Sequence, residues 1–124
     1  MNTTDFEIIR LQILKAYKAC SDSLSDDWTF YDYVNFFSFY ISRYFEVFGK
    51  DHPHMRTQTI KQIIMALPEA YDIYGRPIYF DPDDYPEIID SYFSTDFGDL
   101  CNHAMPHFIS GRIREMRCYD LSLI

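Results

Sequence analysis

The chain has 124 residues and a formal net charge of -8, and 19% of its residues are aromatic, which is high. A chain of this length is typical of a single domain. It buries about two-thirds of the surface that its unfolded form exposes. The composition excludes a low-complexity chain, and three cysteines without CxxC spacing argue against a disulfide framework and against a zinc ribbon.

The first predicted element is an amphipathic helix. Thr4 and Glu7 form a capping-box pattern, and apolar residues follow at helical spacing, so we expect a helix from Asp5 to about Ser21. The N-terminus has no basic start followed by an apolar run, so its pattern does not indicate a secretory signal. With the unpaired cysteines, this favours a reducing, cytoplasmic location.

An aromatic helix is predicted at 29–48, where ten Phe and Tyr residues fall in twenty-one positions up to Gly49. Thr29 and Asp32 are typical of a helix start, and Gly49 is typical of a helix stop. Asp32, Arg43 and other polar residues share one stripe of this helix, which indicates a helix in a protein core and not a membrane span. Two aromatic residues, Tyr31 and Phe39, break the pattern. Phe39 has two interpretations: another segment covers it, for which the C-terminal LSLI is a candidate, or it is an aromatic anchor for a partner.

The middle of the chain changes character after a third helix, which carries Ile60, Ile63, Ile64 and Leu67 and ends before Pro68. Between residues 71 and 80, Gly75-Arg76 fits a two-residue hairpin turn with glycine first. Pro77 stands where that turn needs a hydrogen-bond donor, which weakens the hairpin interpretation.

A short fourth helix is predicted next, with Asp84 as its cap and Pro86 in its first turn. Its predicted core face is Ile88, Ile89, Tyr92 and Phe93. The last element, from about Asp99 to Tyr119, is amphipathic but contains Pro106. The helix therefore either kinks there or restarts with Pro106 in its first turn, and a restart removes His103 from its register.

Taken together, these elements predict one domain over residues 1–124. It is mostly α, a compact bundle of about five helices around the aromatic-rich helix, with a small β-hairpin near 71–80.

Catalytic and metal-binding signals are weak. His103 and His107 are four residues apart, a spacing that can bind a metal, but Ala104 replaces the Glu of the HExxH pattern. The acids near Asp81 lack the glycine and the final Glu of an EF-hand loop, and they are typical of helix capping. No phosphate-binding, dinucleotide-binding or nucleophile-elbow motif occurs. We expect no cofactor, no metal and no enzymatic activity, and a small metal-dependent enzyme is an alternative.

The negative charge is concentrated in one segment. Residues 69–99 contain nine acids and one base, Arg76, whereas the rest of the chain contains ten acids and ten bases. Such a segment favours a basic partner and discourages binding to nucleic acid or anionic lipid. Tyrosine, a good interface residue, recurs among these acids.

The sequence therefore favours a non-enzymatic protein-binding module. We expect a small acidic regulator or inhibitor, of the kind that mobile elements use against host nucleases, whose partner is a basic protein that itself binds nucleic acid. The candidate contact residues are Asp81, Asp83, Asp84, Glu87, Asp90, Tyr79, Tyr85 and Phe39.

A second function class remains open. The last predicted helix carries a basic face, which is typical of a nucleic-acid-binding accessory protein that contacts phosphates. The alternative anion-binding residues are His103, His107, Arg112, Arg114 and Arg117. The competing interpretation is that these arginines fold back and neutralise the acidic segment.

Overall fold

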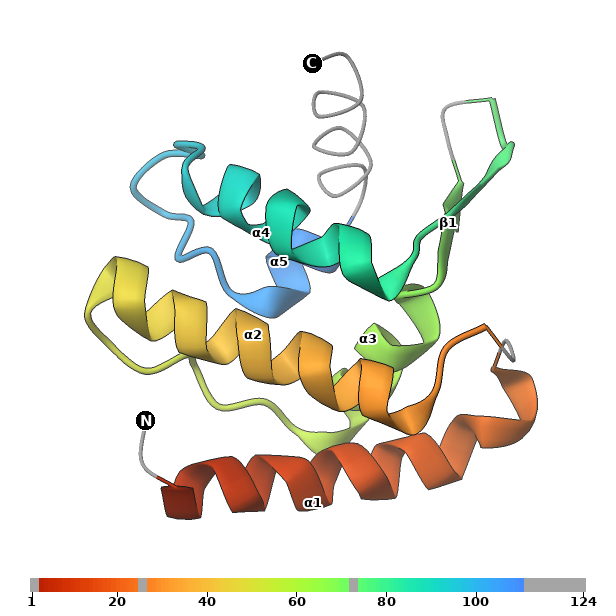
Figure 1. Ribbon diagram of the computed structural model, residues 1–124. Helices are drawn as coiled ribbons and strands as arrows, with labels where there is room; N and C mark the ends of the chain where they lie inside the picture. The colour runs from red at the N-terminus through yellow and green to blue at the C-terminus, as the bar shows by residue number, and fades with distance from the viewer. Residues whose placement is uncertain (1–2, 25–26, 72–73, 111–124) are drawn as a thin grey trace.

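The computed structural model describes residues 3–24, 27–71 and 74–110. Within them the chain forms five α-helices, two short 3-10 helices and one two-stranded antiparallel sheet (Figure 1). The elements in chain order are α1 (Thr3–Cys20), η1 (Ser21–Ser23), α2 (Phe30–Phe48), α3 (Thr57–Ala66), β1 (Glu69–Tyr71), β2 (Pro77–Tyr79), η2 (Pro82–Asp84), α4 (Tyr85–Phe93) and α5 (Met105–Ile109). The predicted fold class is confirmed: the protein is mostly helical, with a small hairpin and an aromatic-rich core.

The aromatic helix α2 begins and ends as its sequence predicts. Thr29 Oγ1 accepts a hydrogen bond from the Asp32 N–H at 3.2 Å, and Asp32 Oδ2 accepts one from the Thr29 N–H at 2.8 Å. At the other end Gly49 adopts φ +69°, a left-handed conformation that favours glycine, and its N–H donates to Phe45 O. Both termini therefore satisfy backbone groups that the helix itself cannot pair.

The core lies around α2, which runs between α1 on one side and α4 on the other (Figure 1). The buried residues of α2 are Tyr33, Val34, Phe36, Phe37, Tyr40, Ile41 and Tyr44. Isoleucines of α3 and the apolar face of α4 complete the same core, including the predicted Ile88, Ile89, Tyr92 and Phe93. Among the described residues, no helix is both long and apolar enough to cross a membrane.

Four buried aromatic side chains use their polar tips to fix connecting segments. The hydroxyls of Tyr40 and Tyr44 donate to the carbonyls of His103 and Asn102, at 2.7 and 2.8 Å. The Tyr85 hydroxyl donates to Leu67 O at 2.5 Å. Trp28 Nε1 donates to Phe80 O at 2.9 Å. The core thus positions both the root of the hairpin and the loop that precedes α5.

The hairpin has a longer turn than Gly75-Arg76 predicts. β1 and β2 pair with Tyr71 opposite Pro77 and Glu69 opposite Tyr79, so residues 72–76 connect the strands. Pro77 has no N–H to close a two-residue turn, which accounts for the longer connection. Gly75, at φ +75°, supplies the left-handed conformation in this loop.

The first and the last helix have bounds that differ from the predicted ones. α1 begins at Thr3, two residues before the predicted start at Asp5. α5 restarts at Met105 with Pro106 in its first turn, and His103 lies before it with φ +57°. The restart is therefore correct and the kinked helix is wrong. The predicted continuation toward Tyr119 lies outside the described residues.

Candidate functional site

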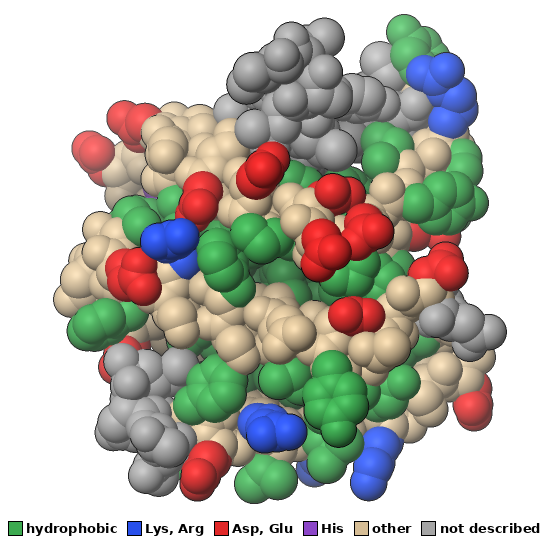
Figure 2. Space-filling model, viewed as in Figure 1, with side chains coloured by type: hydrophobic (Ala, Val, Ile, Leu, Met, Phe, Trp, Pro, Cys, Tyr) green, Lys and Arg blue, Asp and Glu red, His purple; other side chains and the backbone are tan. Residues whose placement is uncertain are grey.

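The acidic surface is formed by η2 and α4. The predicted contact residues Asp81, Asp83, Asp84, Glu87 and Asp90 are all exposed on it. Figure 2 shows acidic side chains gathered over these elements on the face toward the viewer. The term acidic surface is used below for these five residues.

Two of the five carboxylates also hold the local backbone. Asp81 Oδ1 accepts a hydrogen bond from the Asp83 N–H at 3.0 Å, and Asp84 Oδ2 accepts one from the Asp81 N–H at 3.3 Å. This reciprocal pair caps η2, which leads directly into α4. The capping interpretation therefore applies to Asp81 and Asp84, whereas the Asp83 and Glu87 side chains make no hydrogen bond within the described structure.

Only one end of the acidic surface has a counter-ion among the described residues. Arg43 Nε lies 3.0 Å from Asp90 Oδ1, and Arg43 Nη1 lies 2.9 Å from Glu46 Oε2. No described Lys or Arg pairs with the remaining four carboxylates of the surface. Arg112, Arg114 and Arg117 lie outside the described residues, so the fold-back interpretation stays untested.

Phe39 lies beside the paired end of this surface. Its side chain is half-buried against the core, and the Arg43 guanidinium lies over its ring, 5.3 Å from the centroid. The same guanidinium contacts Asp90 of α4, so Phe39, Arg43 and Asp90 form a continuous contact between α2 and α4. The LSLI segment proposed as a cover for Phe39 lies outside the described residues.

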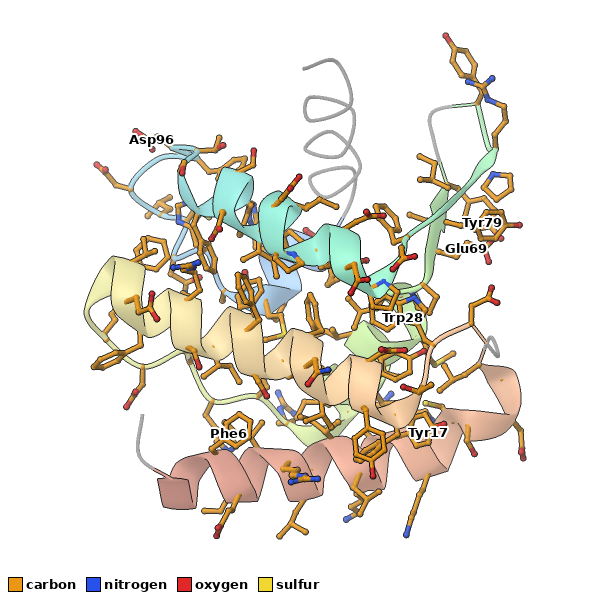
Figure 3. All side chains as sticks on the ribbon, viewed as in Figure 1. Phe6, Tyr17, Trp28, Glu69, Tyr79 and Asp96 are labelled. Atoms are coloured by element: carbon orange, nitrogen blue, oxygen red, sulfur yellow. The ribbon has the colours of Figure 1, made fainter. Side chains whose placement is uncertain are left out.

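The tyrosines of the acidic segment divide into two groups. Tyr71, Tyr74 and Tyr79 of the hairpin are 62%, 74% and 71% exposed. In Figure 3 Tyr79 and Glu69 lie next to each other on the hairpin, directed away from the core. The expectation that Tyr85 contacts a partner needs correction, because its side chain is only 1% exposed and packs among Trp28, Phe36 and Phe80.

The two histidines proposed for anion binding face inward. His103 Nε2 donates to Thr95 O at 2.7 Å, and its ring packs on Phe48 and Phe97. His107 Nδ1 shares a hydrogen bond with the Tyr92 hydroxyl, and burial, together with the nearby His103, lowers the pKa of its imidazole. His103 therefore joins the loop before α5 to the segment after α4, and His107 of α5 contacts α4. The anion-binding face stays a prediction, because the three arginines that it includes lie outside the described residues.

A thiol lies next to His107 that sequence reasoning did not pair with it. Cys101 Sγ is 3.5 Å from His107 Nδ1 and accepts the His103 N–H at 3.5 Å. The shorter contact from Tyr92 occupies the same nitrogen of His107, so that nitrogen is not a free base for the thiol. Among the described residues, no group of three or more His, Cys, Asp or Glu side chains is arranged to hold a metal ion.

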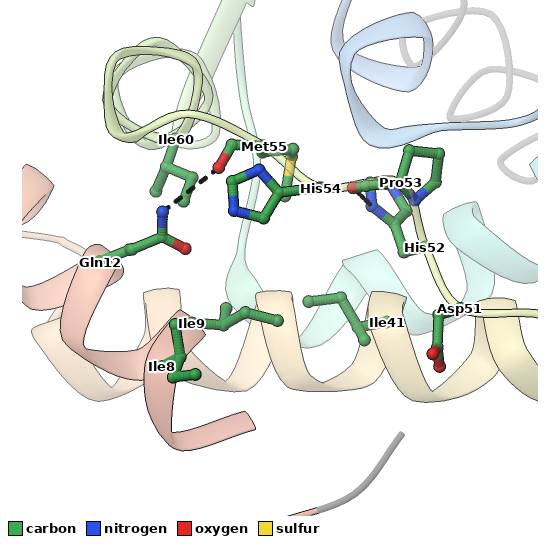
Figure 4. A pocket seen from close by; sticks show the side chains of 10 residues that line it. All are labelled: Ile8, Ile9, Gln12, Ile41, Asp51, His52, Pro53, His54, Met55 and Ile60. Carbon is green, nitrogen blue, oxygen red and sulfur yellow. Dashed lines mark hydrogen bonds between the residues drawn. The ribbon is translucent and has the colours of Figure 1, made fainter. Parts of the chain in front are cut away.

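A pocket of about 310 Å³ opens between α1 and the segment that leads into α3 (Figure 4). Its walls are mainly apolar and include Ile8, Ile9, Ile41, Met55 and Ile60. Two of its polar side chains contact the backbone: Gln12 Nε2 donates to Met55 O, and His52 Nδ1 contacts Pro53 O (Figure 4). No local pattern in the sequence indicates this pocket, because its walls come from three separate segments.

Comparison with known proteins adds no relative: no known family, no curated protein and no solved structure matches this chain.

Proposed function

We propose that this protein is a non-enzymatic binding module that engages a basic protein through the acidic surface and the adjoining tyrosine-rich hairpin. The partner is a protein whose own basic groove holds nucleic acid, and the module acts on it as a small cytoplasmic regulator or inhibitor. Carboxylates then take the place of phosphates in that groove.

The observation that carries this proposal is a set of exposed carboxylates without described counter-ions. The side chains of Asp83 and Glu87 have neither an ion pair nor a hydrogen bond to the described structure. Asp83 stands on the capped η2, and Glu87 stands in the first turn of α4. Charges of one sign on a folded scaffold raise the association rate with a partner of opposite charge. Such a scaffold also avoids the entropy loss that ordering a disordered acidic tail requires.

The hairpin adds exposed aromatic rings to the charges of the acidic surface. Tyr71, Tyr74 and Tyr79 present large rings with polar tips, and tyrosine is enriched among residues that dominate binding energy. β2 runs into η2 with only Phe80 and Asp81 between them, so the elements that carry the rings and the carboxylates follow each other directly along the chain. The proposed contact therefore combines electrostatic attraction with aromatic burial.

A charge-matched pair of variants tests the proposal. Asp83→Asn with Glu87→Gln removes two charges from the acidic surface without touching the cap made by Asp81 and Asp84. Glu7→Gln with Asp22→Asn removes two charges from exposed positions on α1 and η1. Each form is used as bait in lysate of the native cell, and recovered proteins are quantified by mass spectrometry.

We expect the wild type and the Glu7/Asp22 control to recover the same basic protein, and the Asp83/Glu87 variant to lose most of it. The recovered protein must rebind in purified form. Equal recovery by all three baits would overturn the proposal, as would recovery of acidic proteins alone.

A further inference from the structure

Three side chains converge on the outer face of the hairpin. Glu69 and Tyr79 are direct cross-strand partners, and Tyr71 lies two residues from Glu69, on the same face of the sheet. Hydrogen bonding to the Glu69 carboxylate raises the pKa of the Tyr71 hydroxyl, with a smaller contribution from Tyr79. Ala70 and Ile78 take the other face and pack on the core. A carboxylate thus has two exposed phenol rings as neighbours on one face of the hairpin.

The protein holds one of its own guanidinium groups with this combination of ring and carboxylate. Arg43 lies over the Phe39 ring while it pairs with two carboxylates, Asp90 and Glu46. At the hairpin tip, Arg76 lies over the Tyr74 ring, 5.0 Å from its centroid. No described cation occupies the corresponding position between Tyr71 and Tyr79.

We propose that Glu69, Tyr71 and Tyr79 form a binding site for an arginine side chain of a protein partner. This deepens the proposed function, on which it rests. The carboxylate accepts the paired N–H groups of the guanidinium, and the flanking rings contact its flat faces.

Arginine fits this site better than lysine. A guanidinium is planar, delocalised and weakly hydrated, so it can stack on a phenol ring and pair with a carboxylate at the same time. An ammonium group is a compact, strongly hydrated charge that gains from the carboxylate but little from the rings. The acidic surface alone attracts both cations, whereas the hairpin face discriminates between them.

The test is a titration of the full chain, observed through its backbone amide resonances, with two blocked peptides of equal length and charge: oligoarginine and oligolysine. We expect the arginine peptide to bind about 2- to 5-fold tighter, in line with the strength of exposed cation–π contacts, and to shift the resonances of β1 and β2.

Variants separate the contribution of the Tyr79 ring from that of the Glu69 carboxylate and from that of the overall negative charge. Tyr79→Ala should abolish the preference for arginine, Tyr79→Phe should keep it, and Glu69→Gln should weaken it. Tyr31→Ala is the matched control, because Tyr31 is 67% exposed on α2 and does not belong to the proposed site, so its loss should change nothing. Circular dichroism of each variant checks that the helices remain folded.

The outcomes distinguish this inference from the proposed function. If both peptides bind equally and Asp83→Asn with Glu87→Gln weakens both, the acidic surface works but the arginine site does not exist. A preference for arginine that survives Tyr79→Ala, or an arginine peptide that leaves the hairpin resonances unshifted, also overturns the inference.

Discussion

His52 shows at the scale of one residue how this core handles a titratable group. The Met105 N–H donates to His52 Nε2 at 2.8 Å, so that nitrogen carries no proton, and Nδ1 lies 2.8 Å from the Pro53 carbonyl, which can only accept. The ring packs edge-on against Tyr40 and Tyr44. These contacts require the neutral imidazole, and burial lowers the pKa of His52 from 6.5 to about 4.

This environment predicts a loss of stability in mild acid. Because the pKa of His52 is lower in the folded state, its contribution is complete above about pH 6.5 and disappears as the pH falls through about 4. The expected loss is on the order of 2–3 kcal/mol. Urea unfolding of wild type and His52→Gln from pH 7.5 to pH 4 measures it. His54→Gln, at an exposed position, is the control for all other titrating groups, and an identical pH dependence in all three proteins would contradict the prediction.

At the scale of the element, the acidic surface contains carboxylates of two kinds. Asp81 holds the start of η2 through the Asp83 N–H, whereas the Asp83 side chain is exposed and makes no described hydrogen bond. A variant that removes Asp81, Asp83, Asp84 and Glu87 together would therefore mix loss of charge with loss of a cap.

Single substitutions should separate the two kinds. Asp81→Ala should lower the free energy of unfolding by about 1 kcal/mol, because an N-cap hydrogen bond is lost. Asp83→Ala removes the same charge from the same short helix and should cost clearly less. Thermal and urea unfolding of the two variants check this difference, and equal losses would mean that the Asp81 cap contributes nothing.

Elements with local signals could be predicted from the sequence. Thr29, Asp32 and Gly49 specify the ends of α2 through backbone hydrogen bonds within four residues, and the spacing of Ile88, Ile89 and Tyr92 specifies the buried face of α4. Tyr85 belongs to that same helical spacing, and this signal could have identified it as buried. Its position among acids led instead to an exposed assignment.

Features that depend on distant segments could not be predicted in this way. The contact of His52 with Met105 joins residues 53 positions apart, and the pocket of Figure 4 combines α1, α2 and the segment before α3. The inward orientation of His103 and His107 depends on a loop that begins a new helix at Met105. Periodicity carries no information on such packing.

At the scale of the whole molecule, the aromatic helix α2 lies at the centre of the hydrophobic core. Phe37 and Tyr44 are fully buried and Ile41 is 2% exposed. α1 and α4 pack on opposite sides of this helix (Figure 1), so a cavity there should weaken both contacts.

Phe37→Ala should therefore cost about 3–5 kcal/mol of unfolding free energy, a large part of the stability of an ordinary domain. Phe45→Ala is the matched control on the same helix, since Phe45 is 44% exposed, and its cost should be much smaller. Chemical denaturation of both variants provides the comparison. A Phe37→Ala cost below about 1 kcal/mol would show that this face of α2 is not the core.

The central claim is that fixed carboxylates on η2 and α4, which have no counter-ion among the described residues, guide this protein to a basic partner. The most direct test is the association rate constant with the recovered partner, measured by stopped flow at increasing ionic strength. For the wild type and the Glu7/Asp22 control we predict a rate that falls steeply with salt. For Asp83→Asn with Glu87→Gln we predict a slower rate at low salt and a shallower dependence. An association rate constant that does not change with ionic strength, or that is the same in both double variants, would contradict this claim.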